Sequence, residues 1–143
     1  MQILIIQTAF LGDVILATAL IEKLRKQYPI AEIDFLLKKG NEKVLAGHPY
    51  LRNIITFDKK NKVSSLSKLL SQIRKQKYDI VINVQRHLSS GILTAFSGAG
   101  ERIGFSKNPL SALFTKKVPH KWQGHEIDRN QNLIRHLTDE FSE

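Results

Sequence analysis

Residues 3–15 read Ile3-Leu4-Ile5-Ile6-Gln7-Thr8-Ala9-Phe10-Leu11-Gly12-Asp13-Val14-Ile15, and this stretch decides the fold. Its first part, residues 3–8, has the length of a strand and lacks strict alternation, which is typical of a strand buried on both faces in a parallel sheet. From Val14 onward, apolar residues recur at helical spacing until Pro29, which cannot continue a helix. A buried strand that leads into such a helix indicates an α/β fold. Asp13 then follows the first strand, where open α/β sheets place their ligands.

The same alternation of strand and helix continues along the chain. Further strands are predicted at residues 33–37, 53–57, 79–84 and 102–105. Helices or helical turns are predicted at residues 42–46, 89–97, 110–114 and 126–141. A further helix is predicted to begin after Ser64 or Ser67, either of which could be its N-cap residue. Loops are predicted at the basic tract of residues 59–62 and over most of residues 106–123. This order favours a parallel sheet covered by helices, with right-handed crossovers.

Length and composition describe one ordinary domain over residues 1–143. The chain is 42% hydrophobic and 24% charged, which is the composition of a globular domain with a buried core. It has no cysteine, which excludes a disulfide framework and a thiolate metal site. The first residues lack the basic start of a signal peptide, and no stretch approaches the roughly 20 apolar residues of a membrane-spanning helix. We therefore expect a cytoplasmic protein.

The charge balance is strongly basic. Twenty-two lysine and arginine residues face 13 acidic ones, which gives a formal net charge of +9. Such a surplus favours an anionic partner by long-range attraction, whether nucleic acid, anionic lipid headgroups or a phosphorylated sugar. A solvated basic surface without a specific partner explains the charge equally well, so composition alone does not choose among these.

Asp13 has two interpretations. Aspartate is among the best residues at the N-cap of a helix, where its side chain accepts hydrogen bonds from free backbone amides. Alternatively, a carboxylate at this edge of the sheet can act as a general base toward a bound hydroxyl group. Gly12 is expected to allow a sharp turn and the close approach of a substrate. The turn lacks the glycine spacing and the lysine of the known phosphate-binding loops.

Other polar residues are candidates at later positions. Arg86 and His87 follow the strand at residues 79–84, so they are expected at the same edge of the sheet as Asp13. There they can bind an anion or move a proton, or they are simply polar residues of a loop. His125 and Arg129 form a second polar cluster at the start of a predicted helix. The sequence predicts no metal site, because His120 and His125 have no further ligand residues near them.

Four segments, in order, resemble the family 9 glycosyltransferases, the lipopolysaccharide heptosyltransferases. The first is the strand, turn and helix start at residues 3–15. The others are Tyr78-Asp79-Ile80-Val81-Ile82-Asn83-Val84-Gln85, then Ser97-Gly98-Ala99-Gly100-Glu101-Arg102-Ile103-Gly104-Phe105, and His125-Glu126-Ile127-Asp128-Arg129-Asn130. Together they extend over nearly the whole chain.

The resemblance implies the N-terminal half of a GT-B enzyme, which is a Rossmann-like parallel sheet with helices on both faces. In this family the N-terminal domain binds a lipid A-linked sugar or lipopolysaccharide core acceptor, and a C-terminal domain binds the donor ADP-heptose. Asp13 would be the base of an inverting transfer that needs no metal or resident cofactor. The acceptor-binding residues would be Leu11, Gly12, Gln85, Arg86, His87, His125 and Arg129. An acidic, lipid-linked acceptor also fits the basic charge and implies a peripheral position at the inner membrane.

Two departures from the family pattern matter. This chain has Asn83 and Arg86 where many members carry aspartate and glycine, so contacts to the acceptor are expected to differ there. The chain also ends at Glu143, so we expect the donor-binding domain to be absent and the isolated chain to transfer no sugar. The alternative function is a stand-alone basic Rossmann-like module that binds nucleic acid or anionic lipid, although no nucleic-acid motif is present. A response-regulator-like domain would need an acidic pair after the first strand, which Asp13 alone does not supply.

Overall fold

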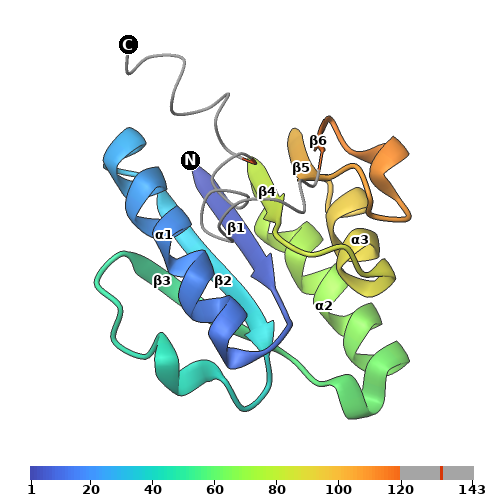
Figure 1. The fold of residues 1–143 in the computed structure, drawn as a ribbon, viewed down its shortest axis with the longest axis horizontal. Helices are drawn as coiled ribbons and strands as arrows, with labels where there is room; N and C mark the ends of the chain where they lie inside the picture. Colours follow the sequence, from blue (N-terminus) through green and yellow to red (C-terminus); the bar gives the residue numbers. More distant parts are fainter. Residues whose placement is uncertain (120–132, 134–143) are drawn as a thin grey trace.

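A computed structural model describes residues 1–119 and Leu133 of the chain. In this part, six parallel strands form one sheet in the order β3-β2-β1-β4-β5-β6 (Figure 1). The strands are Gln2–Gln7 (β1), Glu32–Lys38 (β2), Leu51–Phe57 (β3), Ile80–Asn83 (β4), Glu101–Phe105 (β5) and Lys116–Val118 (β6). The helices are Leu11–Gln27 (α1), Lys62–Gln76 (α2) and Leu88–Ala95 (α3), and the 3-10 turns are Glu42–Val44 (η1), Lys59–Asn61 (η2) and Ser111–Leu113 (η3). The predicted Rossmann-like α/β fold is confirmed.

The central strand β1 is buried on both faces, as its sequence predicts. Ile3 and Ile5 belong to an apolar cluster with the buried face of α1, whereas Leu4 and Ile6 belong to a second cluster with residues of α2 and α3. All four side chains are fully buried. Helices therefore cover both faces of the sheet, and the apolar run of β1 reflects two cores rather than one.

The strand order reverses direction beside β1. The chain first builds β2 and β3 outward on one side, and α2 then returns it to β4 on the other side of β1. Open parallel sheets bind ligands at such a switch point, outside the carboxyl ends of the strands. In Figure 1 the arrowheads of β1 and β2 mark this edge, at the bottom of the view. Both α1 and α2 begin there.

Two helices begin at least three residues earlier than predicted. Helix α1 starts at Leu11, three residues before Val14, and Phe10 is its N-cap residue. Helix α2 starts at Lys62 with Asn61 as the N-cap, so neither Ser64 nor Ser67 is the cap. The basic tract of residues 59–62 is a 3-10 turn joined to the start of α2 and not a loop, because the side chain of Asp58 accepts a hydrogen bond from the backbone N–H of Lys60.

The segment after β5 also differs from the prediction. A short strand, β6, pairs with β5 inside the region predicted to be mostly loop. The predicted helical turn at residues 110–114 shrinks to η3. Leu133 is fully buried in the apolar cluster that contains β5 and β6 residues, whereas the rest of the helix predicted at residues 126–141 lies outside the described residues. Among the described residues, no helix has the length and apolar character needed to cross a membrane.

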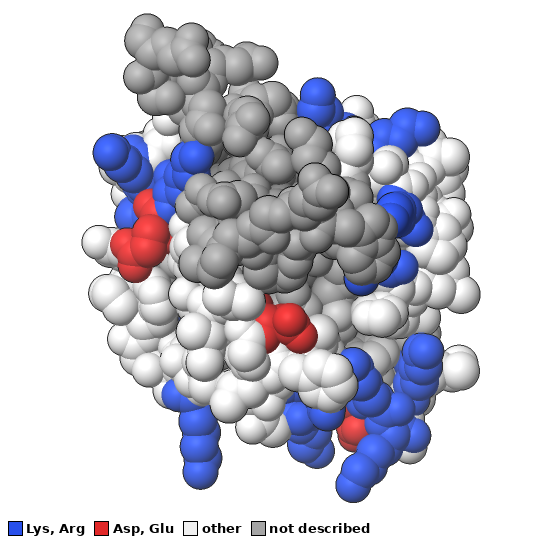
Figure 2. All heavy atoms as spheres, in the orientation of Figure 1, with Lys and Arg blue, Asp and Glu red and all other residues white. Residues whose placement is uncertain are grey.

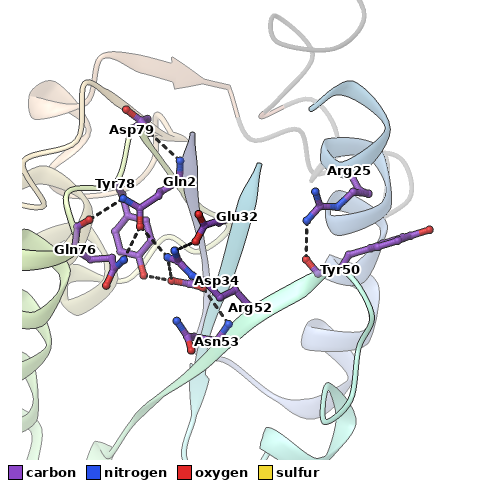
Figure 3. Close-up of polar contacts among 10 residues, drawn as sticks. All are labelled: Gln2, Arg25, Glu32, Asp34, Tyr50, Arg52, Asn53, Gln76, Tyr78 and Asp79. Carbon is purple, nitrogen blue, oxygen red and sulfur yellow. Dashed lines mark hydrogen bonds and ion pairs between the residues drawn. The ribbon is translucent and has the colours of Figure 1, made fainter. Parts of the chain in front are cut away.

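A buried carboxylate ties the amino ends of the strands together (Figure 3). Asp34 of β2 is fully buried, and it accepts hydrogen bonds from the guanidinium of Arg52, from the backbone N–H of Asn53 and from the hydroxyl of Tyr78. Arg52 also pairs with Glu32. The charge of Asp34 is thus compensated by direct contacts, which is the condition for keeping an ionised group in a core.

Candidate functional site

The carboxyl ends of the two central strands are joined by one side chain. The backbone N–H of Thr8, which follows β1, donates to the Oε1 atom of Gln85 at 2.8 Å, and the Thr8 hydroxyl donates to the same atom. Both residues are buried. Gln85 follows β4, and β1 and β4 are neighbours in the sheet. The loops that leave these strands therefore start from a fixed position relative to each other.

A cavity of about 320 Å³ lies at this edge of the sheet. The beginnings of α2 and α3 border it, together with the ends of β1 and β3. Its lining residues are Thr8, Phe57, Lys59, Lys62, His87, Leu88 and Ser89. Hydroxyl, ammonium and imidazole side chains thus surround a pocket of the size that holds part of a small ligand.

The cavity has a strongly positive character. Burial, followed by the charges of Lys38 and Lys62, lowers the pKa of Lys59 below the usual range of a lysine, which indicates that these three ammonium groups lie near one another. Figure 2 shows basic side chains projecting from the lower edge of the molecule, where α2 begins. Such a cluster attracts an anionic ligand, because a bound anion relieves the mutual repulsion of the lysines.

Two helix N-termini add to this field. The first turns of α2 and α3 contain no acidic residue, and their N-cap residues, Asn61 and His87, make no capping hydrogen bond through their side chains. The first backbone N–H groups of a helix lack partners within the helix and carry partial positive charge. The starts of both helices therefore place partial positive charge near Lys62 and Ser89, which favours an anionic group there.

Asp13 is the third residue of α1 and not its N-cap. Its Oδ2 atom accepts a hydrogen bond from the backbone N–H of Phe10 at 3.1 Å, so the carboxylate folds back over the start of the helix. The predicted N-cap position is wrong, although the side chain does stabilise this helix end. The Oδ1 atom accepts no hydrogen bond from the described residues. One oxygen thus positions the half-buried carboxylate while the other remains available.

Gly12 lies inside the first turn of α1 and not in a sharp turn. Its φ is not in the left-handed region, so the backbone does not require glycine here, and that part of the prediction is wrong. A Cβ atom at Gly12 would have no neighbour within 4 Å, so the surface beside Asp13 is open. Leu11 is exposed next to it. The absence of a side chain leaves room for a ligand to approach the helix start.

The structure brings only some of the predicted site residues together. His87 lines the cavity, and Gln85 accepts a hydrogen bond from Thr8, which also lines it. Arg86 is exposed on the same loop but does not line the cavity. His125 and Arg129 lie outside the described residues. The contributions of Thr8, Lys59, Lys62 and Ser89 to a cavity were not predicted, although a basic tract directly after a strand is a signal that could have suggested them.

Two amide groups at the end of β4 are left without acceptors. The Oδ1 atom of Asn83 accepts a hydrogen bond from the backbone N–H of Gln85, but the Nδ2 atom of Asn83 and the Nε2 atom of Gln85 are buried and donate to no described residue. An unmade hydrogen bond of a buried donor costs about 1–3 kcal/mol. Neither residue lines the cavity, so these two donors lie buried beside the end of β4 without an acceptor among the described residues.

Comparison with known proteins gives the family. The model of glycosyltransferase family 9 (heptosyltransferase) matches residues 66–142, which is more than half of the chain. The chain belongs to glycosyltransferase family 9. The resemblance seen in the sequence is therefore confirmed at the level of the family, although Asp13 lies outside the matched segment.

Relatives among characterised proteins carry consistent names. The chain is 26% identical to lipopolysaccharide heptosyltransferase 1 of Pseudomonas aeruginosa over 97% of its own length and 43% of that protein. It is 29% identical to lipopolysaccharide heptosyltransferase 1 of Campylobacter coli over 96% of its own length and 40% of that protein. The chain thus spans less than half the length of these family 9 relatives.

Solved structures show the same fold. A family 9 glycosyltransferase from Veillonella parvula is 28% identical, with a TM-score of 0.87, over 95% of this chain and 40% of that one. The Escherichia coli heptosyltransferase WaaC with ADP has a TM-score of 0.81 at 19% identity, over 95% of this chain and 46% of that one. The described sheet and helices therefore have the fold of the matched part of these family 9 structures.

Proposed function

We propose that this chain is the acceptor-binding, N-terminal domain of an inverting glycosyltransferase of lipopolysaccharide core biosynthesis. The names of its relatives point to that pathway. The observation that carries the proposal is the cavity at the switch point of the sheet, where Lys59 and Lys62 and the start of α3 converge. A lipopolysaccharide core acceptor is phosphorylated and acidic, and it is complementary to such a site.

The proposed chemistry is a single displacement. The lysines and helix amides bind acidic groups of the acceptor and hold one of its hydroxyl groups near Asp13. Asp13 takes the proton of this hydroxyl as the acceptor oxygen forms a bond to the anomeric carbon of the donor sugar. The bond between that carbon and the phosphate oxygen of ADP breaks at the same time, which inverts the configuration. The reaction as proposed needs neither a metal nor a resident cofactor.

The donor in this proposal is ADP-heptose, bound by a second, C-terminal domain. One of the related structures is heptosyltransferase WaaC of Escherichia coli with ADP-2-deoxy-2-fluoro heptose, of which this chain covers 48%. The edge of the sheet that carries Asp13 would face the donor domain. Holding the two substrates between two domains places the reacting atoms together and supplies much of the rate enhancement.

A peripheral position at the cytoplasmic side of the inner membrane forms part of the proposal. Exposed apolar side chains gather at the same edge of the sheet as the lysines. They are Phe10, Leu11, Ile15, Val44, Val63 and Leu88. Basic groups interleaved with exposed apolar groups fit a surface that rests on anionic headgroups and inserts a few side chains below them. A lipid-linked acceptor would then meet the site at the bilayer surface.

Binding of a soluble acceptor tests the central claim. The probe is a deacylated lipopolysaccharide core oligosaccharide, used with its phosphates and after their enzymatic removal. We expect the chain to bind the phosphorylated form more tightly, and the variant Lys59→Gln/Lys62→Gln to lose this preference. Lys75→Gln is the control, because Lys75 is exposed in the last turn of the same helix, away from the cavity.

The same titration separates this function from the alternative one. Binding of an arbitrary DNA duplex with steep salt dependence, together with no preference for the core oligosaccharide, would favour a nucleic-acid module and overturn the proposal. Equal loss of binding in Lys75→Gln would show that the net charge, and not the cavity, is responsible.

A further inference from the structure

Asn108 lies in the connection between β5 and β6, yet its side chain belongs to the candidate site. It is only 2% exposed. Its Nδ2 atom donates to the backbone carbonyl of His87 at 3.0 Å and, at 3.4 Å, to the carbonyl of Gln85. One amide group therefore holds two carbonyls of the four-residue connection, residues 84–87, that leads from β4 into α3.

Asn108 is itself fixed by its own loop. Its Oδ1 atom accepts a hydrogen bond from the backbone N–H of Leu110 at 3.0 Å, and its backbone N–H donates to the carbonyl of Phe105 at 3.0 Å. Because both side-chain atoms of the amide have defined partners, its orientation is determined. The donor side can only face the loop of Gln85 and His87.

Helix α3 is shaped to receive this side chain. A Cβ atom at Gly91 would lie 2.2 Å from the Oδ1 atom of Asn108, which is far inside the contact distance of real atoms. Glycine costs about 1 kcal/mol relative to alanine inside a helix. Gly91 therefore reflects the close packing of the Asn108 amide against the first turns of α3.

The backbone carbonyl of His87 accepts three of these hydrogen bonds. The backbone N–H of Gly91 and the hydroxyl of Ser90 both donate to it at 3.0 Å, in addition to Asn108. With its carbonyl held on the side of Asn108, the loop presents His87, Leu88 and Ser89 to the cavity. The orientation of the α3 amides thus depends on a residue about twenty positions downstream.

We propose that Asn108 is a positioning residue that sets the α3 side of the anion-binding cavity, and that Gly91 leaves the space that the Asn108 side chain needs. This inference rests on the proposed function of the cavity. Asn108 touches no ligand itself and acts through the backbone of His87. It couples the corner between β5 and β6 to the site at the ends of β1 and β4.

The variant Asn108→Asp tests this with almost no change of shape. Aspartate retains the acceptor for Leu110 but cannot donate to the carbonyls of Gln85 and His87, which it repels. Inorganic phosphate is the probe, followed by backbone amide NMR of the full chain. We expect the phosphate Kd to rise about five- to tenfold, because a donor is replaced by a charge that repels the carbonyl, and the amide signals of His87, Leu88 and Ser89 to shift.

Ser111→Ala is the matched control. The Ser111 hydroxyl donates to the carbonyl of Ser106 within the same loop, so its loss weakens that loop without touching the loop of His87. We expect the control to lower the melting temperature while the phosphate Kd stays within about twofold of the wild type. Gly91→Ala displaces the Asn108 side chain from the other side and should reproduce the effect of Asn108→Asp; it decides the matter if Asn108→Asp does not fold.

The outcomes separate the two claims. If Asn108→Asp and Gly91→Ala lower stability but leave the signals of residues 87–89 and the phosphate Kd unchanged, Asn108 has only a structural role and the inference is overturned. If the signals shift but the wild-type chain binds no phosphate, Asn108 positions the loop as inferred, whereas the proposed function of the cavity fails.

Discussion

The Oδ2 atom of Asp13 lies 3.1 Å from the backbone nitrogen of Phe10, which makes the proposed base part of the helix end that carries it. A carboxylate at the start of a helix stabilises the helix dipole, so the same group can serve the fold and the reaction. Charge and geometry must therefore be separated in any test of Asp13.

Asp13→Asn makes this separation. Asparagine retains an oxygen that accepts the Phe10 N–H but carries no charge. We expect the free energy of unfolding, measured with urea, to fall by about 0.3–1 kcal/mol. Sugar transfer by a protein that also carries the donor domain should be abolished. Turnover at the wild-type rate would show that Asp13 only stabilises the helix.

Gly12→Ala separates folding from ligand access in a similar way. Gly12 has a helical backbone with open space at the Cβ position, so alanine should stabilise the chain by about 0.5–1 kcal/mol. If a ligand approaches this surface, affinity for the core oligosaccharide should fall in the same variant. Gly40→Ala is the control, because its φ of +107° makes alanine destabilising despite equal space. Unchanged affinity would place the acceptor elsewhere.

The lysine cluster predicts a particular pH dependence of anion binding. Because burial and neighbouring lysines lower the pKa of Lys59, it loses its proton at a lower pH than an ordinary lysine, whose pKa is about 10.4. A bound anion favours the charged form, so the Kd for sulfate should rise as pH increases through the pKa of Lys59. Lys59→Gln should bind sulfate more weakly at neutral pH and with less pH dependence. If the sulfate Kd of Lys59→Gln had the same pH profile as that of the wild type, the lysine cluster would not be the anion-binding site.

The lowered pKa of Lys59 also makes the stability of the chain depend on pH, and stability changes with pH in the opposite direction to anion binding. Without an anion, the unfolded chain holds a proton on Lys59 more tightly than the folded chain does. Stability therefore rises with pH between the pKa of Lys59 in the folded chain and about 10.4. Thermal unfolding without sulfate measures this rise, and Lys59→Gln should reduce it.

Tyr78→Phe tests the buried carboxylate. The Tyr78 hydroxyl donates to Asp34, and hydrogen bonds to charged groups contribute about 1.5–3 kcal/mol, so the variant should lose about that much stability. Burial and Asp34 raise the pKa of Tyr78. Its stabilisation is therefore complete below pH about 10 and declines above it, a decline that Tyr78→Phe should lack. Tyr50→Phe is the control. Tyr50 accepts a hydrogen bond from Arg25 through its backbone carbonyl, so removal of the Tyr50 hydroxyl leaves that bond intact.

Membrane docking is tested by a pair of exposed apolar side chains. Val63 beside the lysines of α2 is 84% exposed, and Ile30 at the opposite edge of the sheet is 93% exposed. We expect Val63→Glu to reduce cosedimentation with phosphatidylglycerol vesicles several-fold and Ile30→Glu to leave it unchanged, because only Val63 would enter the bilayer. Equal effects of the two variants would mean that the interaction is electrostatic only.

The sequence predicted the central sheet well and the helix starts less well. Ile3 to Ile6 form a run that only a doubly covered strand explains, and this identified β1. The start of α1 was missed because Phe10 and Leu11 are apolar yet exposed, so periodicity gives no signal there. Strand β6 was missed because it is short and two of its three residues are exposed lysines.

The candidate site was only partly predictable for a related reason. His87 could be placed because it follows a strand directly, and parallel strands end at one edge of the sheet. The convergence of Lys38 with Lys59 depends on where β2 and β3 end and on the early start of α2, none of which follows from a local pattern. Asn108 lies in a segment without periodicity, and its role depends wholly on tertiary contacts.

Thr8 and Gln85 are 77 positions apart in the chain, and their hydrogen bond closes the site. During synthesis, β1, β2 and β3 all emerge before any residue of β4, so the cavity cannot exist until the crossover through α2 has been completed. An anion that occupies the cavity therefore binds only the finished domain. By mass action, such a ligand acts as a selective stabiliser of the assembled sheet, and an anionic acceptor would favour completion of folding as well as reaction.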